Sequence, residues 1–216
     1  VLATGSHWRR DGRGRSLRSA VASFADARTV TPEEVMAGAG VQGPVVIFDD
    51  DHYYMGGVLA ELLVREGHAV TLVTPAPRVS EWAVNTMEQH RIQRSLLELG
   101  VTVIPSTTLV AAGGGSARVA CTYTEAERNL ACDTVVLVTA RLPQEDLLDD
   151  LVARTADWAG AGLSTVEGIG DARSPGTIAA AVWDGRRYAE EIDADDPGDD
   201  VPFLREIVRL APHARG

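Results

Sequence analysis

Cysteine is scarce in this sequence of 216 residues, and several class-defining features are missing altogether. The separation of Cys121 and Cys132 matches neither a CxxC redox motif nor a zinc or iron–sulfur ligand set, so we expect reduced core thiols in a cytoplasmic protein. No apolar stretch approaches the ~20 residues that cross a bilayer, and there is no signal peptide. These absences argue against a disulfide-stapled, metal-binding or membrane-spanning chain.

Basic residues are also few, since the sequence has 20 of them against 31 acidic residues and a net charge of -11. Such a surface repels nucleic-acid phosphates and anionic membranes, so we expect neither as a partner. The only basic cluster falls in the first eighteen residues, where intervening glycines favour a solvated loop. With 45% hydrophobic residues, the chain can form one large domain or two small ones.

The chain begins at Val1 without an initiator methionine, and its first residues resemble the end of a buried strand running into a glycine turn. We therefore expect a fragment that a further region precedes. Residues 31–40 predict a connector with a short helix, since Thr31 can cap it and Pro32 suits its first position.

The middle of the chain predicts an α/β unit. Residues 45–48 form an apolar run typical of a doubly covered strand, residues 58–65 a helix ended by Gly67, and residues 70–73 the next strand, which together give a βαβ crossover. A helix ended by Gly100 and strands at 101–104 and 134–138 follow. Residues 109–133 predict an antiparallel meander. The expected fold is a Rossmann-like, three-layer FAD/NAD(P)-binding fold with a parallel sheet and a β-meander.

The last third predicts a helix over 147–158, a strand ending in a turn at 168–172, and an amphipathic helix over 177–192 with one face buried on a sheet. We predict four segments: residues 1–40 as part of an ADP/FAD-type domain and connector, 41–142 as an inserted, degenerate NAD-type domain, 143–192 as the return to the first domain, and 193–216 as an acidic linker and tail.

The turn that should hold a coenzyme's diphosphate is altered. A dinucleotide-binding unit has GxGxxG here, whereas this chain places Asp49, Asp51 and Tyr54 at the three glycine positions. Carboxylates repel a diphosphate and block its close approach to the backbone. The second strand ends in Thr74 and Pro75 instead of an acidic ribose ligand. We hypothesise that residues 45–138 keep the fold but have lost the ligand.

The same acidic run, residues 49–51, could hold magnesium or calcium, since carboxylates suit hard cations. Its spacing fits no EF-hand loop, so a solvated acidic turn is the favoured interpretation. His52, His68 and His90 have no cysteine or second histidine at ligand spacing, and we interpret each as a surface or packing residue. No metal site and no catalytic residue is predicted.

Two short motifs resemble recurring marks of the FAD/NAD-linked disulfide-reductase-like flavoproteins. They are the Ala3, Thr4, Gly5 turn and the Gly-Asp of residues 168–172, in that order around the inserted unit. In those proteins both motifs lie near the bound nucleotide. The resemblance therefore implies that Ala3, Thr4, Gly5 and Asp171 flank a nucleotide.

Across essentially its whole length, the chain resembles the C-terminal regions of histamine dehydrogenase- and trimethylamine dehydrogenase-like flavoproteins. Residues 46–54, 70–75 and 170–183 carry the resemblance. It implies a missing TIM barrel with FMN and a 4Fe-4S cluster, oxidation of an amine, electron transfer to an electron-transfer flavoprotein, a structural ADP and a homodimer. This chain would then be the ADP-holding, non-catalytic module of the enzyme.

Two alternatives remain open. One is the NAD(P)H-binding part of a 2,4-dienoyl-CoA reductase or old-yellow-enzyme-like oxidoreductase, against which the altered turn argues. The other is a non-catalytic interaction domain whose acidic surface recruits a redox partner.

Overall fold

The computed structural model describes residues 1–192, which divide into two compact units. The sheet unit is His7–Leu142, and the helical unit combines Val1–Ser6 with the chain from Pro143 onward. Two short strands, β1 (Ser6–Trp8) and β10 (Arg141–Pro143), lie where the chain leaves one unit for the other and pair with each other. The predicted acidic tail, residues 193–216, lies outside the described residues.

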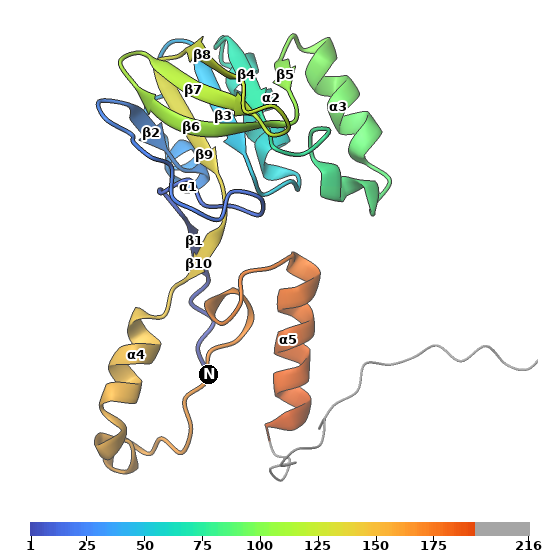
Figure 1. Ribbon diagram of the computed structural model, residues 1–216. Coiled ribbons are helices and arrows are strands. Elements are labelled where there is room, and N and C mark those ends of the chain that lie inside the picture. The colour runs from blue at the N-terminus through green and yellow to red at the C-terminus, as the bar shows by residue number, and fades with distance from the viewer. Residues whose placement is uncertain (193–216) are drawn as a thin grey trace, which may run out of the picture. The chain divides into compact units, whose positions relative to one another are not determined.

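A parallel five-stranded sheet forms the centre of the sheet unit (Figure 1). Its strands, in spatial order, are β2 (Arg28–Val30), β9 (Thr134–Val138), β3 (Val45–Asp49), β4 (Val70–Val73) and β5 (Thr102–Ile104). Every residue of β3 and β9 is buried, as apolar runs covered on both faces require. The predicted strands at 45–48, 70–73, 101–104 and 134–138 are thereby confirmed.

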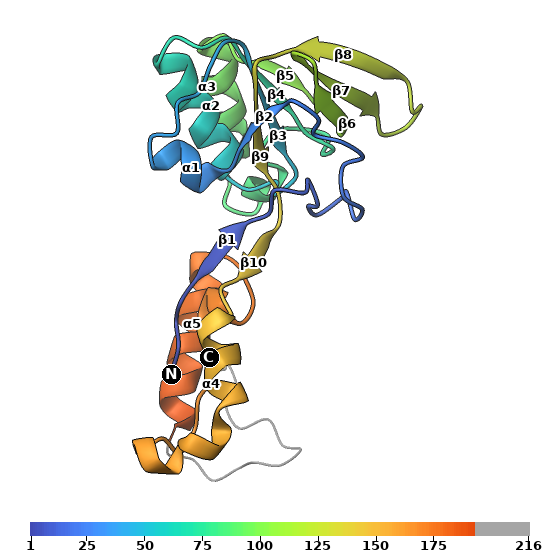
Figure 2. The same cartoon turned by 90° about the vertical axis from the view of Figure 1, so that its left-hand side faces the viewer.

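Helices cover one face of this sheet and an antiparallel meander covers the other (Figure 2). The helices are α1 (Pro32–Met36), α2 (Met55–Arg65) and α3 (Gln89–Glu98), with a 3-10 turn, η1 (Glu81–Val84), before α3. The meander strands are β6 (Thr107–Gly113), β7 (Ser116–Cys121) and β8 (Glu127–Ala131). The three-layer fold expected from the sequence is confirmed.

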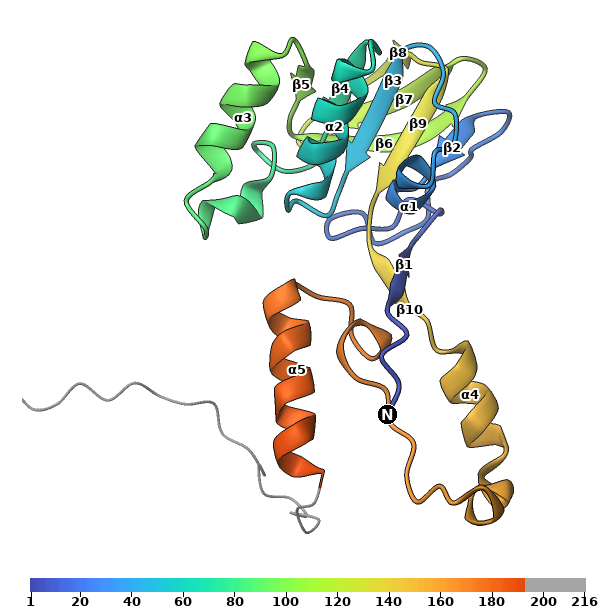
Figure 3. The same ribbon diagram turned by 180° about the vertical axis from the view of Figure 1, so that it is seen from behind.

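Side chains that alternate along the strands feed two separate cores. Ile47 packs with the helices, while its neighbour Phe48 packs with the meander. The view from behind shows α1 and α2 in front of the sheet (Figure 3). The predicted helix stops are confirmed, since Gly67 and Gly100 adopt positive φ values of 93° and 84° directly after the C-cap residues of α2 and α3.

In its described part, up to residue 192, the helical unit contains two helices, α4 (Asp146–Ala153) and α5 (Ile178–Glu191), and three short 3-10 turns. These turns are η2 (Thr155–Asp157), η3 (Ala159–Ala161) and η4 (Gly170–Ala172). The helix predicted over 147–158 breaks after Ala153. The strand predicted at 168–172 is only a single parallel bridge between Leu2 and Gly168, because η4 follows at once.

The predicted burial of the amphipathic helix is wrong for this chain by itself. Ile178 is 75% exposed and Val182 67% exposed, and α5 contains no buried residue. Apolar spacing predicts which face of a helix can be buried, but it does not supply the surface that covers that face. Among the described residues, the helical unit contains no extended sheet that could do so.

Two further expectations concern the cysteines and the membrane. Cys121 and Cys132 are both free thiols, but only Cys132 is buried, so the prediction of two core thiols is wrong for Cys121. Burial raises the pKa of the Cys132 thiol to about 11. Within residues 1–192, no helix combines the length and the apolar character that a membrane span needs.

Candidate functional site

Asp49 ends β3 at the turn where a dinucleotide-binding fold holds a diphosphate. Its side chain is fully buried, and its Oδ1 accepts hydrogen bonds from the backbone amides of Asp51 (3.2 Å) and His52 (3.1 Å). The other oxygen, Oδ2, is buried without a hydrogen-bond partner. The carboxyl group therefore points into the turn and binds the turn's own amides.

The first turn of α2 lies directly against this carboxyl group. A Cβ atom at Gly56 would stand 2.4 Å from Oδ2 of Asp49, so only glycine fits at this position. Burial raises the pKa of Asp49 to about 7, and the nearby Asp51 carboxylate acts in the same direction, although the two amides oppose both effects. The carboxyl group of Asp49 therefore changes its protonation state near neutral pH.

Asp50 is also fully buried and fastens a second segment to the same turn. Its Oδ2 accepts hydrogen bonds from the amides of Leu17 (2.8 Å) and Ser16 (3.1 Å), and Nε2 of His52 lies 2.9 Å from its Oδ1. A Cβ at Gly14 would come within 2.3 Å of Oδ2, so glycine is required there as well. Burial alone would raise the pKa of Asp50, but His52 and these amides together lower it below its ordinary value.

The expectation of a solvated acidic turn is therefore wrong for its first two residues. Both carboxyl groups turn inward because backbone amides are available to them, and hydrogen bonds offset the cost of burial. The surface or packing role assigned to His52 missed its contact with Asp50. Among residues 1–192, no three histidine, cysteine or acidic side chains are grouped so that they could bind a metal ion.

His52 itself has a positive φ of 63°, which is uncommon outside glycine. Its carbonyl oxygen accepts a hydrogen bond from the amide of Trp82 (2.9 Å), which ties the turn to η1. The guanidinium group of Arg15 lies 5.1 Å from the Trp82 ring, and its Nε donates to the carbonyl oxygen of Asp51 (2.6 Å). Contacts on several sides thus hold the unusual backbone of His52.

The end of the second strand offers no ribose ligand in the structure. Thr74 is buried, and its Oγ1 accepts a hydrogen bond from the amide of Ala76 (3.2 Å). The hydroxyl group stabilises the local turn instead of facing solvent. This agrees with the sequence, which has no acidic residue at the position.

The residues predicted to flank a nucleotide, Ala3, Thr4, Gly5 and Asp171, all lie in the helical unit. Thr4 donates its Oγ1 hydrogen bond to the carbonyl oxygen of Gln144 (2.7 Å), and the amide of Gln144 donates to the carbonyl oxygen of Gly5 (2.9 Å). Gly5 has a φ of 80°, so the turn requires glycine. Ala3 and Thr4 are both exposed.

Leu2 and Ser6, the residues that flank the turn at residues 3–5, bring Asp171 close to it. Leu2 forms a parallel bridge with Gly168, and Ser6 donates its hydroxyl hydrogen bond to Oδ2 of Asp171 (3.1 Å). The other oxygen of Asp171 accepts a hydrogen bond from the amide of Gly176 (3.0 Å), just before α5. The two sequence motifs therefore meet in space, although Ser6 and Asp171 are 165 positions apart in the chain. Their role toward a nucleotide stays a prediction.

Sequence reasoning missed two members of this arrangement. Ser6 provides the hydroxyl group that reaches Asp171, and Oδ2 of Asp184 accepts a hydrogen bond from the amide of Gly170 (2.7 Å). Asp184 lies inside α5 and Gly170 in η4, so no local spacing in the sequence marks this contact. Thr177 caps α5 by accepting a hydrogen bond from the amide of Ala180 (3.3 Å).

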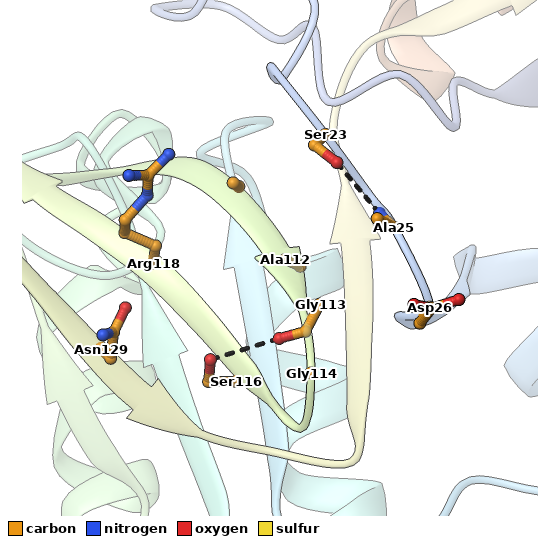
Figure 4. Close-up of a pocket in the computed structure, with 10 residues that line it drawn as sticks. Ser23, Ala25, Asp26, Ala112, Gly113, Gly114, Ser116, Arg118 and Asn129 are labelled. Atoms are coloured by element: carbon orange, nitrogen blue, oxygen red, sulfur yellow. Dashed lines mark hydrogen bonds between the residues drawn. The ribbon is translucent and has the colours of Figure 1, made fainter.

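A separate hollow of about 350 Å³ lies between the β6–β7 hairpin and residues 23–26 (Figure 4). Arg118 and Asn129 lie on one side of it and Asp26 on the other. Arg118 is paired with Glu127 at 3.4 Å. The hollow can offer hydrogen bonds to a polar molecule, but its exposed charged side chains form no catalytic arrangement.

Taken together, these features define a class: a Rossmann-like fold whose first turn binds its own carboxyl groups, joined to a unit in which two short turn motifs meet. Residues 30–139, just over half of the chain, match the family model of the OYE-like second alpha/beta domain. The chain belongs to this family.

Relatives extend the match to nearly the whole chain. Dimethylamine dehydrogenase from Hyphomicrobium sp. (strain x) is 33% identical over 95% of this chain and 31% of its own length. The structure of histamine dehydrogenase from Rhizobium sp. 4-9 is 42% identical, with a TM-score of 0.89 over 97% of this chain and 33% of that one. The 6-hydroxypseudooxynicotine amine oxidase from Pseudomonas geniculata N1 is 35% identical, with a TM-score of 0.76 over 86% and 27% of the respective chains.

The chain thus spans about a third of the length of these relatives. The resemblance to histamine dehydrogenase inferred from the sequence is confirmed, and the chain is homologous to amine dehydrogenases. The names of these relatives are those of two amine dehydrogenases and an amine oxidase.

Proposed function

We propose that this chain is the C-terminal module of a flavin- and iron–sulfur-dependent amine dehydrogenase that passes electrons to an electron-transfer flavoprotein. The observation that carries the proposal is the 42% identity to histamine dehydrogenase over 97% of the chain. Amine oxidation, FMN and the 4Fe-4S cluster would all belong to the part of the protein outside this chain. The module itself would be structural.

The nucleotide held by the module would be ADP, at the meeting of the two turns in the helical unit. Support comes from the bridge between Leu2 and Gly168 and from the hydrogen bond between Ser6 and Asp171. The capped N-terminus of α5 follows directly, and such a terminus favours phosphate groups. Ala3, Thr4 and Gly5 would contact the nucleotide from the exposed turn.

The exposed apolar residues of the helical unit fit this assignment. Ile178, Val182 and Leu147 are between 46% and 75% exposed, whereas a helix of a finished domain buries such side chains. A domain completed by another part of the protein would cover them. The module would therefore contribute one portion of an ADP-type domain, in a homodimeric cytoplasmic enzyme.

The experiment uses the full-length protein. Nucleotide released by denaturation is identified and counted, and dimethylamine or histamine is tested for reduction of an artificial electron acceptor. We expect one ADP per subunit and amine-dependent reduction. NADH consumption without amine-dependent reduction would refute the proposal and favour the NAD(P)H-dependent reductase. A protein with no bound nucleotide and neither activity would favour the interaction domain.

The role of Asp171 is tested separately with Asp171→Asn in the full-length enzyme. We expect the ADP content to fall, and Asp184→Ala is the matched control because it removes the acceptor that holds the amide of Gly170 in the same turn. If both variants lose ADP equally, Asp171 acts only by holding the turn. If neither loses ADP, the nucleotide does not lie beside this turn.

A further inference from the structure

The β3–α2 turn contains the groups that bind a diphosphate in a dinucleotide-binding fold: free backbone amides and the N-terminus of a helix. In this chain those amides are already in use. The amides of Asp51 and His52 both donate to Oδ1 of Asp49, at 3.2 and 3.1 Å. An incoming phosphate oxygen would have to displace this carboxyl oxygen.

The space for a phosphate is filled as well. Oδ2 of Asp49 would stand only 2.4 Å from a Cβ at Gly56, in the first turn of the eleven-residue α2, and it is fully buried without a hydrogen-bond partner. A carboxyl group at the N-terminus of a helix is placed favourably relative to the helix dipole. Asp49 therefore combines the position and the acceptor chemistry of a bound phosphate.

Asp50 links the turn to a second segment of the chain. Its carboxyl oxygens accept hydrogen bonds from the amides of Ser16 and Leu17, and Nε2 of His52 lies 2.9 Å away. The left-handed backbone of His52 is thus held between two carboxyl groups of the chain itself.

We propose that Asp49 is a specificity-determining residue whose carboxyl group stands in for a nucleotide phosphate at the β3–α2 turn, so that the turn is complete without a dinucleotide. The inference concerns the sheet unit and is independent of the ADP assigned to the helical unit. Its corollary is a latent anion site. If the acceptor oxygen is removed and the amides remain, the turn should bind a small phosphate compound.

Three variants of the 216-residue chain test this with inorganic pyrophosphate as the probe. Asp49→Gly removes the acceptor and should open the site. Asp49→Asn keeps a carbonyl oxygen for the two amides and should leave the site closed. Asp51→Gly is the matched control, because it removes a neighbouring carboxylate that accepts no hydrogen bond from the turn amides.

We expect pyrophosphate at about ten times its Kd to raise the midpoint of thermal unfolding of Asp49→Gly by about 3–5 °C. The wild type, Asp49→Asn and Asp51→Gly should respond no more than to sodium chloride of equal ionic strength. In Asp49→Gly, the amide NMR signals of residues 51 and 52 should shift on titration. A wild-type chain that binds pyrophosphate equally well, or an open variant that does not respond, would overturn the proposal.

A second measurement keeps the proposal testable if Asp49→Gly does not fold. Hydrogen exchange of the amides of Asp51 and His52 should be slow in the wild type and in Asp49→Asn, since both retain the acceptor oxygen. Free exchange of both amides in the folded wild-type chain would contradict the assigned role of Asp49.

Discussion

The buried carboxyl group of Asp49 predicts an unusual dependence of stability on pH. A carboxyl group whose pKa is raised in the folded state stabilises the fold fully below its unfolded pKa, and this contribution is lost as the pH rises through the folded pKa. For Asp49 the two values are 3.8 and about 7, and burial is the main cause of the difference. The protein should therefore lose stability between these values.

The magnitude follows from proton linkage. The difference between the unfolded and folded pKa values of Asp49, 3.8 and about 7, corresponds to about 4 kcal/mol of the free energy of unfolding. About 2–3 kcal/mol of this is lost between pH 5 and pH 8. Groups with lowered pKa values change the stability in a different pH range. Asp11, with a pKa lowered to about 2 mainly by its hydrogen bond with Arg9, contributes stability that disappears only as the pH falls below about 4.

Asp49→Asn removes the titration while keeping an oxygen for the amides of Asp51 and His52. The assay is urea-induced unfolding followed by circular dichroism at pH 5, 6, 7 and 8. We expect the free energy of unfolding of the wild type, relative to Asp49→Asn, to fall by about 2–3 kcal/mol across this range. Asp149→Asn, at an exposed position of α4, is the control and should follow the wild type.

Parallel curves for the wild type and Asp49→Asn would refute the reasoning, because they would mean that Asp49 binds no extra proton in the folded state. A difference that grows in the opposite direction would also refute it. That result would require a carboxylate stabilised by the turn amides more strongly than burial destabilises it.

Two further substitutions probe the packing and the helix ends. Gly113→Ala should lower the free energy of unfolding by about 1–3 kcal/mol, since the new Cβ would stand 2.2 Å from the carbonyl oxygen of Ala25. Urea-induced unfolding measures this, with Gly160→Ala as the control because the space around Gly160 is open. Thr177→Ala removes the acceptor for the amide of Ala180 and should destabilise α5 by about 1 kcal/mol. Amide hydrogen exchange in the first turn of α5 should then become faster, whereas unchanged exchange would show that the cap contributes nothing.

The sheet unit was predictable because its signals are local. The apolar runs at 45–48 and 134–138 have the composition of strands buried on both faces, and glycines at 67 and 100 mark the helix ends. The meander likewise follows from short β-branched runs between turns. Each of these elements depends on residues within about ten positions of one another.

The inward direction of the Asp49 and Asp50 side chains was not predictable in the same way. Carboxylates are rarely buried, and the donors that make burial possible for Asp50 belong to Ser16 and Leu17, more than thirty residues earlier. One local signal was available: Gly56 falls in the first turn of the helix, where a close neighbour requires a residue without a side chain. Composition alone favoured solvent for an acidic turn.

The wrong prediction of a buried face on α5 has a different cause. The same cause determines how the two units contribute to stability. The sheet unit encloses two clusters of buried apolar side chains, whereas Ala172 is the only buried apolar residue among the described residues of the helical unit. Apolar burial is the main source of folding free energy. Among residues 1–192, most of the stability must therefore reside in the sheet unit.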